Sequence, residues 1–314
     1  MRFSVIIPLY NKAPYVHKAI GSVSCQTFRD FELIVLDDGS TDNSFLIAQE
    51  TLKGSGLNYK LIHQANAGVS MARNNGVSVS QGSYLCFLDA DDWWAPTFLE
   101  RIDWLITAYP DAGIYGTNYY YVKSGKQRVC VKNVESGYIN YCQVYAEGLS
   151  MPLTSISVAI PRAIFDEMNG FNPSLRLGED FDLWIRITLK YKVSFLNEPL
   201  AFYYQDSDPR WRGTGHLIKP AENMLWNLDY LEEYEASNSD YKKLIDRLRI
   251  YSLFPYYLSN QYRDLAKQEL ARVDWTKQPK RIQRLYNTPI FILLCRRVIL
   301  KCGSRVKQFL IRNL

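Results

Sequence analysis

The sequence lacks the residue patterns that build disulfide-stabilised or zinc-stabilised folds. It has six cysteines and three histidines in 314 residues, with no Cys-x-x-Cys pair and no zinc-ligand spacing. Structural zinc sites and disulfide scaffolds require such spacings. Because unpaired cysteines are typical of reducing compartments, we expect a cytoplasmic protein whose fold depends on its hydrophobic core.

Two phosphate-binding signatures are also absent. The sequence contains no GxxxxGK[ST] loop and no GxGxxG after its first apolar run. Such glycine-rich loops hold phosphates through backbone N–H groups at the start of a helix. A nucleotide bound to this chain would therefore be held by acidic side chains, a cation and a few hydrogen-bond donors.

The N-terminus lacks the pattern of a signal peptide or a membrane span. "MRFSVIIPLY" enters a strand-like run directly, contains a proline and has no small-residue cleavage site. Hydrophobic residues make up 47% of the sequence and charged residues 22%, as in ordinary globular proteins. The chain is long enough for one large domain or two smaller ones.

Acidic residues are missing from the C-terminal end. No Asp or Glu follows Asp274, while ten Lys or Arg residues lie between Lys277 and Arg312. Because the positive charge belongs to this tail, the main body shows no pattern of a nucleic-acid-binding protein. Apolar residues between 289 and 311 alternate with the basic ones, which is typical of a helix on an anionic membrane surface. A helix packed on the protein with a solvated basic side is an equally good interpretation.

The first ninety residues alternate between strand-like and helical patterns. Near-continuous apolar runs followed by amphipathic segments predict a Rossmann-like, mostly parallel sheet with helices on both faces, an α/β fold. The predicted strands are 3–10, 31–40, 57–64 and 83–90, and the helices between them are 14–27, 41–54 and 67–80. Later segments predict a helix at 95–108, strands at 112–122, 127–134 and 155–160, helices after Pro161 and Gly178, and a strand pair at 193–204. From about residue 215 onward the patterns are helical only.

Polar side chains follow three of the first four predicted strands. They are Tyr10–Asn11, Asp37–Asp38 and the group Asp89, Asp91 and Asp92. Each group alone could belong to a turn or a helix cap. Ligands of such sheets bind beyond the carboxyl ends of the strands, so their common position indicates a binding crevice.

The stretch "YLCFLDADDWW" ends a buried-looking strand in three carboxylates. Burying one unpaired charge costs several kcal/mol or more, so the cluster needs solvent, hydrogen bonds or a cation. Asp89 and Asp91 are two residues apart and can reach one crevice, where carboxylate and phosphate oxygens suit Mg²⁺ or Mn²⁺. The structural alternative is a helix cap, for which one Asp would suffice.

A second acidic group, Glu179–Asp180, follows Gly178. Acidic residues at the start of a helix are favoured by the macrodipole for structural reasons alone. The functional interpretation is a general base, a carboxylate that removes the proton from a hydroxyl nucleophile.

Five ordered blocks of this sequence together resemble glycosyltransferase family 2, whose enzymes have the GT-A fold. The resemblance extends from residue 3 to about 205, and its blocks are "SVIIPLYNK", "ELIVLDDGSTDNS", "NAGVSMARNNGV", "YLCFLDADD" and "IPRAIFDEMNGFNPSLRLGEDFDLWIRI". The resemblance implies a GT-A domain over 1–214, with a nucleotide-sugar half (1–110) and an acceptor half (111–214). A helical C-terminal region with the basic tail would occupy 215–314.

The resemblance implies four residues that contact the nucleotide. Pro8 and Tyr10 match positions that line the base pocket, with Tyr10 as a stacking partner. Asp38 matches the acid that hydrogen-bonds uracil, and Arg73 matches a basic residue near the nucleotide.

It also implies the residues of the chemical step. Asp89 corresponds to the acid on the ribose side, and Asp91 to the residue that carries the Mn²⁺ or Mg²⁺ bridging the diphosphate, with Asp89 beside it. Asp180 corresponds to the catalytic base, and Glu179 would lie close to the acceptor.

The implied function is an inverting transfer of a sugar from a nucleotide sugar, by family habit a UDP-sugar. The acceptor would be a hydroxyl of a saccharide or lipid-linked saccharide in surface polysaccharide biosynthesis, and a lipid-linked acceptor would fit a peripheral position on the inner face of the cell membrane. The alternatives are a synthase that passes a sugar to a polyprenyl phosphate and a non-catalytic protein that binds sugar nucleotides.

One segment departs from the family pattern. Family members often carry an Arg where "FYYQDSDPRWRGTGH" has Gln205. Arg210, Arg212 or His216 could supply the missing contact with the diphosphate.

Overall fold

The computed structural model describes residues 1–207 and 217–294. The chain divides into two compact units, Met1–Tyr234 and Glu235–Leu314. Each unit has its own secondary structure and its own buried residues.

The first unit is built on one sheet, which has ten strands in the described residues. The strands are β1 (Phe3–Leu9), β2 (Phe31–Asp37), β3 (Tyr59–His63), β4 (Tyr84–Phe87), β5 (Trp93–Trp94), β6 (Ala112–Lys123), β7 (Lys126–Val129), β8 (Gly137–Ile139), β9 (Val158–Pro161) and β10 (Lys192–Tyr204). Their order is β3-β2-β1-β4-β9-β6-β10-β5, with β7 beside β6 and β8 beside β10. Strands β1 to β4 pair in parallel, and β9 joins β4 and β6 antiparallel. The predicted α/β fold is confirmed.

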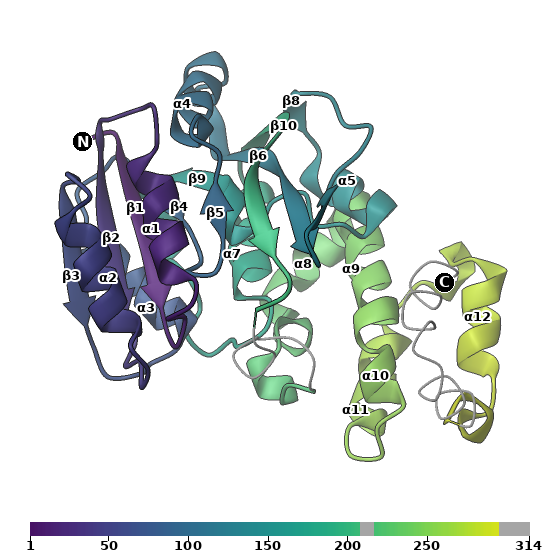
Figure 1. The fold of residues 1–314 in the computed structure, drawn as a ribbon. Coiled ribbons are helices and arrows are strands. Elements are labelled where there is room, and N and C mark those ends of the chain that lie inside the picture. Colours follow the sequence, from purple (N-terminus) through teal and green to yellow (C-terminus); the bar gives the residue numbers. More distant parts are fainter. Residues whose placement is uncertain (208–216, 295–314) are drawn as a thin grey trace. The chain divides into compact units, whose positions relative to one another are not determined.

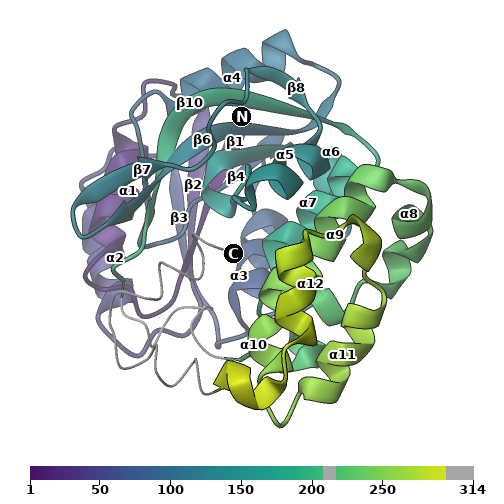
Figure 2. The ribbon, with the colours of Figure 1, turned by 90° about the vertical axis from the view of Figure 1, so that its right-hand side faces the viewer.

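Helices cover both faces of the parallel part of the sheet. Figures 1 and 2 show α1 and α2 on one face of β1 to β3 and α3 on the other. The helices of this unit are α1 (Val16–Ser24), α2 (Ser44–Lys53), α3 (Val69–Ser78), α4 (Phe98–Ala108), α5 (Tyr141–Gly148), α6 (Arg162–Glu167) and α7 (Glu179–Thr188). Short 3₁₀ turns follow at Pro220–Glu222, Met224–Trp226 and Asp229–Leu231.

The central strands β1 and β2 are buried along their whole length, as expected for near-continuous apolar sequences. Every residue of β1 and of β2 is buried. Pro8 is compatible with this position because the pairing of β1 with β4 ends at Ile6 and Phe87. Its missing N–H therefore removes no bond to β4.

The expected strand pair at 193–204 is wrong, because this segment is the single strand β10. Its register against β6 shifts between Leu196 and Pro199 and again between Pro199 and Ala201. A proline removes one ladder donor, and the bulge around it divides the apolar pattern into two apparent strands.

The second unit is helical in its described part, as predicted for this region (Figure 2). It contains α9 (Ser239–Ser252), α10 (Phe254–Tyr257), α11 (Arg263–Ala271), a 3₁₀ turn (Trp275–Lys277) and α12 (Lys280–Asn287), and α8 (Glu232–Ser237) spans the boundary between the units. Arg249 is fully buried and pairs with Glu235 at 2.5 Å and with Glu269 at 3.2 Å. No helix in the described residues could span a bilayer. Residues 295–314 of the basic tail, for which the sequence predicts either membrane contact or packing on the protein, lie outside them.

Candidate active site

The loop after β1 is held by the loop after β2. Asn11 has a φ of 50°, in the left-handed region that asparagine tolerates better than most residues. Its backbone N–H donates to Ser40 Oγ at 3.0 Å, and its side-chain oxygen accepts from the N–H of Thr41 at 2.8 Å. The N–H of Lys12 donates to Ser44 Oγ at 2.7 Å. Two strand ends that the sequence predicts to be neighbours are therefore joined rigidly.

Asp38 organises the loop that leads into α3. Its carboxylate is buried and accepts hydrogen bonds from the N–H groups of Ala67 and Gly68, each at 2.8 Å, and from Gln64 Nε2 at 2.7 Å. Together these three hydrogen bonds fix the backbone of the loop. The predicted base-binding acid thus shapes the start of α3.

Arg73 joins the two acidic groups of the sequence. Its guanidinium donates to Asp89 Oδ1 at 2.7 Å and to Glu179 Oε1 at 3.1 Å, and it lies over the ring of Phe171. Burial alone would lower the pKa of Arg73, but the two carboxylates outweigh this effect and raise it. The arginine stays charged and holds the start of α7 against the end of β4.

Asp91 is paired with Lys12, which was not among the predicted site residues. Lys12 Nζ lies 2.5 Å from Asp91 Oδ2, and the exposed fraction of each side chain is 14%. Lys12 directly follows the polar strand end Tyr10–Asn11, so its position was the signal that could have indicated it.

Asp92 has a structural role. It is buried and accepts a hydrogen bond from the N–H of Tyr204 at 2.6 Å, which ties the acidic loop to the end of β10. Burial raises the pKa of Asp92 well above its usual range, and the neighbouring charges of Asp91 and Asp89 raise it further.

Gly178 and the residues after it form the start of α7. Gly178 has a φ of +82°, and a Cβ at this position would approach Met224 Cβ to 3.0 Å. Glycine is therefore needed for Glu179 and Asp180 to begin the helix here. Loss of water contact raises the pKa of Asp180 to about 7, with a further increase from Glu179 and an opposing effect from Arg73. A carboxylate with this pKa can accept a proton near neutral pH.

Three tyrosines near the acids were also missed. Burial raises the pKa of Tyr141 and Tyr145, and the charge of Asp180 contributes to both increases. Burial likewise raises the pKa of Tyr203 in β10, followed by the charge of Asp92 and the other acids of the site. Because their pKa values are raised, these hydroxyls keep their protons at neutral pH. Their sequence signal was only the high tyrosine content, which packing also explains.

Several predicted site residues come together and others do not touch them. Arg73 links Asp89 to Glu179, with Asp180 next in the chain. Asp38 binds its own loop, and Pro8 and Tyr10 lie at the end of β1. The predicted diphosphate contacts at 210, 212 and 216 lie outside the described residues.

The acids suit a divalent ion that is shared with a ligand. No three His, Cys, Asp or Glu side chains gather as a metal cage anywhere in residues 1–207 or 217–294. Mg²⁺ typically takes one or two carboxylates together with substrate phosphate oxygens and needs no such cage. Asp91 and Asp89 provide hard oxygen ligands, and Asp91 already attracts a cation, the Lys12 ammonium. The donor chemistry therefore fits Mn²⁺ or Mg²⁺.

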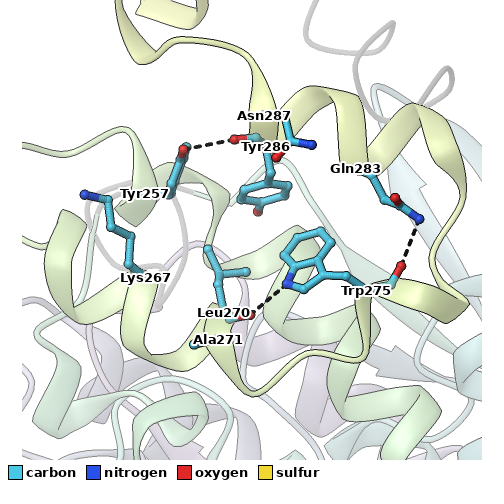
Figure 3. A pocket seen from close by; sticks show the side chains of 8 residues that line it. All are labelled: Tyr257, Lys267, Leu270, Ala271, Trp275, Gln283, Tyr286 and Asn287. Carbon is cyan, nitrogen blue, oxygen red and sulfur yellow. Dashed lines mark hydrogen bonds between the residues drawn. The ribbon is translucent and has the colours of Figure 1, made fainter.

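The second unit contains a separate cavity of about 330 Å³ (Figure 3). It is lined by Tyr257, Lys267, Leu270, Ala271, Trp275, Gln283, Tyr286 and Asn287. Most of its polar groups bond the unit's own backbone. Trp275 Nε1 donates to Leu270 O at 3.1 Å, and the Tyr257 hydroxyl donates to Tyr286 O at 3.2 Å. The cavity is therefore mainly a packing feature of this unit.

A family model described as "Glycosyl transferase family 2" matches residues 4–167, just over half of the chain. The chain is a member of glycosyltransferase family 2. The resemblance seen in the sequence is thereby confirmed.

Curated relatives agree with the family. An uncharacterized glycosyltransferase of Rickettsia felis is 30% identical over 64% of this chain, and the match spans 32% of that relative's length. Glycosyltransferase GlyG of Streptococcus pneumoniae is 24% identical over 76% of this chain and 79% of its own. The match therefore spans about a third of the Rickettsia relative's length and most of GlyG's.

Two solved structures show that the fold is of the GT-A type. S. aureus TarS 1–349 in complex with UDP-GlcNAc has a TM-score of 0.61 at 19% identity, over 86% of this chain and 71% of TarS. Mannosyltransferase PcManGT from Pyrobaculum calidifontis, in complex with GDP-Man and Mn²⁺, has a TM-score of 0.59 at 17% identity, over 98% of this chain and 82% of its own.

Proposed function

We propose that this family 2 member is an inverting glycosyltransferase that moves a sugar from a nucleoside diphosphate sugar, preferably a UDP-sugar, to an acceptor hydroxyl. The observation that carries the proposal is the position of Arg73. It connects Asp89, at the predicted donor side, with Glu179, next to the predicted base Asp180. Arg73 thus connects an acid that we propose for the diphosphate with the segment that carries the carboxylate we propose for proton transfer.

In this proposal, each acidic residue of the site has its own role in the transfer. Asp180 accepts the proton of the attacking hydroxyl, for which its pKa of about 7 is suited. Glu179 is held by its ion pair with Arg73 and would support the acceptor side. When bound to Asp91 and Asp89, a Mn²⁺ or Mg²⁺ ion would supply positive charge for the leaving diphosphate. A single displacement inverts the configuration, so an α-linked donor would give a β-glycoside.

The end of β1 and the loop after β2 are the proposed nucleotide pocket. Tyr10 offers a ring for base stacking beside Pro8, and Asp38 with the fixed 64–68 loop offers hydrogen bonds. TarS is solved with UDP-GlcNAc and PcManGT with GDP-Man and Mn²⁺, which supports a nucleotide sugar as the ligand class.

The acceptor and the location are proposed from the sequence. We propose a saccharide or lipid-linked saccharide acceptor, bound over residues 111–214 beside Asp180, and a peripheral position of the basic tail on an anionic membrane. Flotation of the full chain with vesicles containing anionic lipid, against vesicles of neutral lipid, tests the membrane contact. Equal recovery from the two would contradict it.

A calorimetric screen of nucleotide sugars with and without Mn²⁺ tests the donor. We expect one donor to bind and to need the metal for full affinity. With that donor and candidate acceptors, release of free nucleoside diphosphate would demonstrate transfer. A donor that binds but never releases nucleotide with any acceptor would indicate a non-catalytic binding protein, and no binding at all would contradict the proposal.

A further inference from the structure

Backbone hydrogen bonds fix the position of Lys12. Its N–H donates to Ser44 Oγ at 2.7 Å, and its carbonyl oxygen accepts from the N–H groups of Tyr15 at 2.9 Å and Val16 at 3.0 Å. These bonds form the entry to α1 and fix the residue on both sides. Its side chain is only 14% exposed. The ammonium group is therefore held close to Asp91.

Lys12 supplies a positive charge that the acidic loop at 89–92 needs. Three carboxylates lie within four positions, at Asp89, Asp91 and Asp92. Asp89 is paired with Arg73, and the buried Asp92 accepts a hydrogen bond from the N–H of Tyr204. In the described residues, Lys12 is the ion-pair partner of Asp91. Without a metal, this ammonium is what keeps the Asp91 carboxylate compensated.

The ammonium and a metal ion cannot share the same carboxylate oxygen. Lys12 Nζ lies 2.5 Å from Asp91 Oδ2. A divalent ion would lie about 2.1 Å from a ligand oxygen and would repel the ammonium. Lys12 must therefore leave Oδ2 when a metal binds there, and it then needs another anionic partner. Phosphate oxygens of a bound diphosphate are such a partner.

We propose that Lys12 is a displaceable counter-cation that couples metal binding at Asp91 to the arrival of the diphosphate. This inference rests on the proposed function, because it assumes a nucleoside diphosphate and a divalent metal in this crevice. Before the donor binds, Lys12 competes with the metal for Asp91. When the diphosphate binds, Lys12 transfers its hydrogen bond to phosphate oxygens and Asp91 becomes available to the metal.

Such coupling is reciprocal, since the factor by which the diphosphate tightens metal binding equals the factor by which the metal tightens diphosphate binding. Removal of the ammonium should strengthen metal binding to the free protein. It should also reduce the coupling factor. In the diphosphate-free protein, the metal would no longer compete with the Lys12 ammonium for Asp91. A typical coupling of this kind corresponds to about ten-fold in affinity.

Manganese binding to the full chain tests this inference directly. Electron paramagnetic resonance would measure free and bound Mn²⁺ for wild type, Lys12→Met and Lys18→Met, each with and without UDP. Lys18 is a matched control because its charge also acts on Asp92, while its Nζ lies over the Trp93 ring at 2.9 Å from the centroid. Lys12→Gln is the second charge-removing variant if Lys12→Met does not fold, and Lys12→Arg keeps the charge as a further control.

We expect Lys12→Met and Lys12→Gln to bind Mn²⁺ about ten-fold more tightly than wild type in the absence of UDP. Their coupling factor with UDP should fall by the same amount, while Lys18→Met and Lys12→Arg stay close to wild type. An unchanged affinity of Lys12→Met for free Mn²⁺, with normal coupling in wild type, would overturn this inference alone. If Lys12→Met and Lys18→Met gained the same Mn²⁺ affinity, the gain would come from the lower net positive charge alone. That result would also overturn this inference. If neither UDP nor GDP brings Mn²⁺ to the wild-type protein, the proposed function fails as well.

Discussion

Arg73 and Glu179 lie 106 positions apart in the chain, and their side chains meet at 3.1 Å. The contact joins α3, which follows the predicted nucleotide-binding loop, to the first residue of α7, which carries Asp180. Because Arg73 also binds Asp89, one buried guanidinium sets the spacing between the proposed donor and acceptor sides. The predictions below follow from this arrangement.

The pH dependence of transfer should report the pKa of Asp180. A base must be deprotonated to act, and an acid with a pKa of about 7 is mostly protonated below that pH. We therefore expect kcat/KM to rise with pH through about pH 7. The negative charge of Glu179 contributes to the raised pKa, so Glu179→Gln should move the midpoint of the profile to lower pH. If the midpoint of the pH profile is unchanged in Glu179→Gln, the titrating group is not Asp180.

Replacement of Arg73 by Met should destabilise the first unit. The side chain is 3% exposed, and its removal leaves Asp89 and Glu179 without their partner in a confined space. Breaking a buried ion pair from one side costs about 3 kcal/mol. Denaturant unfolding would measure the loss of unfolding free energy.

Arg101→Met is the matched control for this experiment. Arg101 forms a two-pronged pair with Glu198, but the exposed fractions are 31% and 43%. Exposed pairs contribute about 1 kcal/mol or less. Similar losses of unfolding free energy in Arg73→Met and Arg101→Met would contradict a larger contribution from the buried Arg73 pairs.

Gly178→Ala should impair catalysis more than stability explains. Alanine at a φ of +82° is strained by about 1 kcal/mol, and its Cβ would crowd Met224. Relief of that contact would shift Glu179 and Asp180. Gly125→Ala is the control, since Gly125 has a φ of +73° with nothing within 4 Å of the added Cβ. We expect both variants to lose similar stability, but only Gly178→Ala to lose kcat. Equal kcat values in the two would contradict a positioning effect.

Asp38→Ala should loosen the loop before α3. The N–H groups of Ala67 and Gly68 would lose their acceptor, and an unpaired buried donor costs about 1–3 kcal/mol. Hydrogen exchange at these two amides should accelerate about ten-fold or more, with weaker nucleotide binding. Asp30→Ala, at an exposed position before β2, should change neither quantity. Normal exchange at both amides in Asp38→Ala would show that the loop is held by other contacts.

The sequence patterns predicted the parallel part of the sheet because β1 and β2 are mostly apolar runs that are buried along their whole length. They could not predict β5 or β8, since two or three residues carry no measurable period. Pro199 made one long strand resemble two. Local patterns reveal an element only when it is long and regular.

The candidate site was predicted in part. The acids were visible because carboxylates at strand ends and at the start of a helix are chemically unusual, and the family resemblance gave them roles. The contact of Lys12 with Asp91 was not visible, because 79 positions separate them and a lysine after a strand is common. Which side chains meet across such distances depends on the fold, as does the raised pKa of Asp180.

The most direct test of the account is the transfer rate of Asp180→Asn, measured with saturating donor, Mn²⁺ and acceptor. Asparagine has nearly the same shape but cannot accept the proton. We predict a folded protein that binds the nucleotide sugar with wild-type affinity and transfers sugar about a hundred- to ten-thousand-fold more slowly. Turnover close to the wild-type rate would contradict the account.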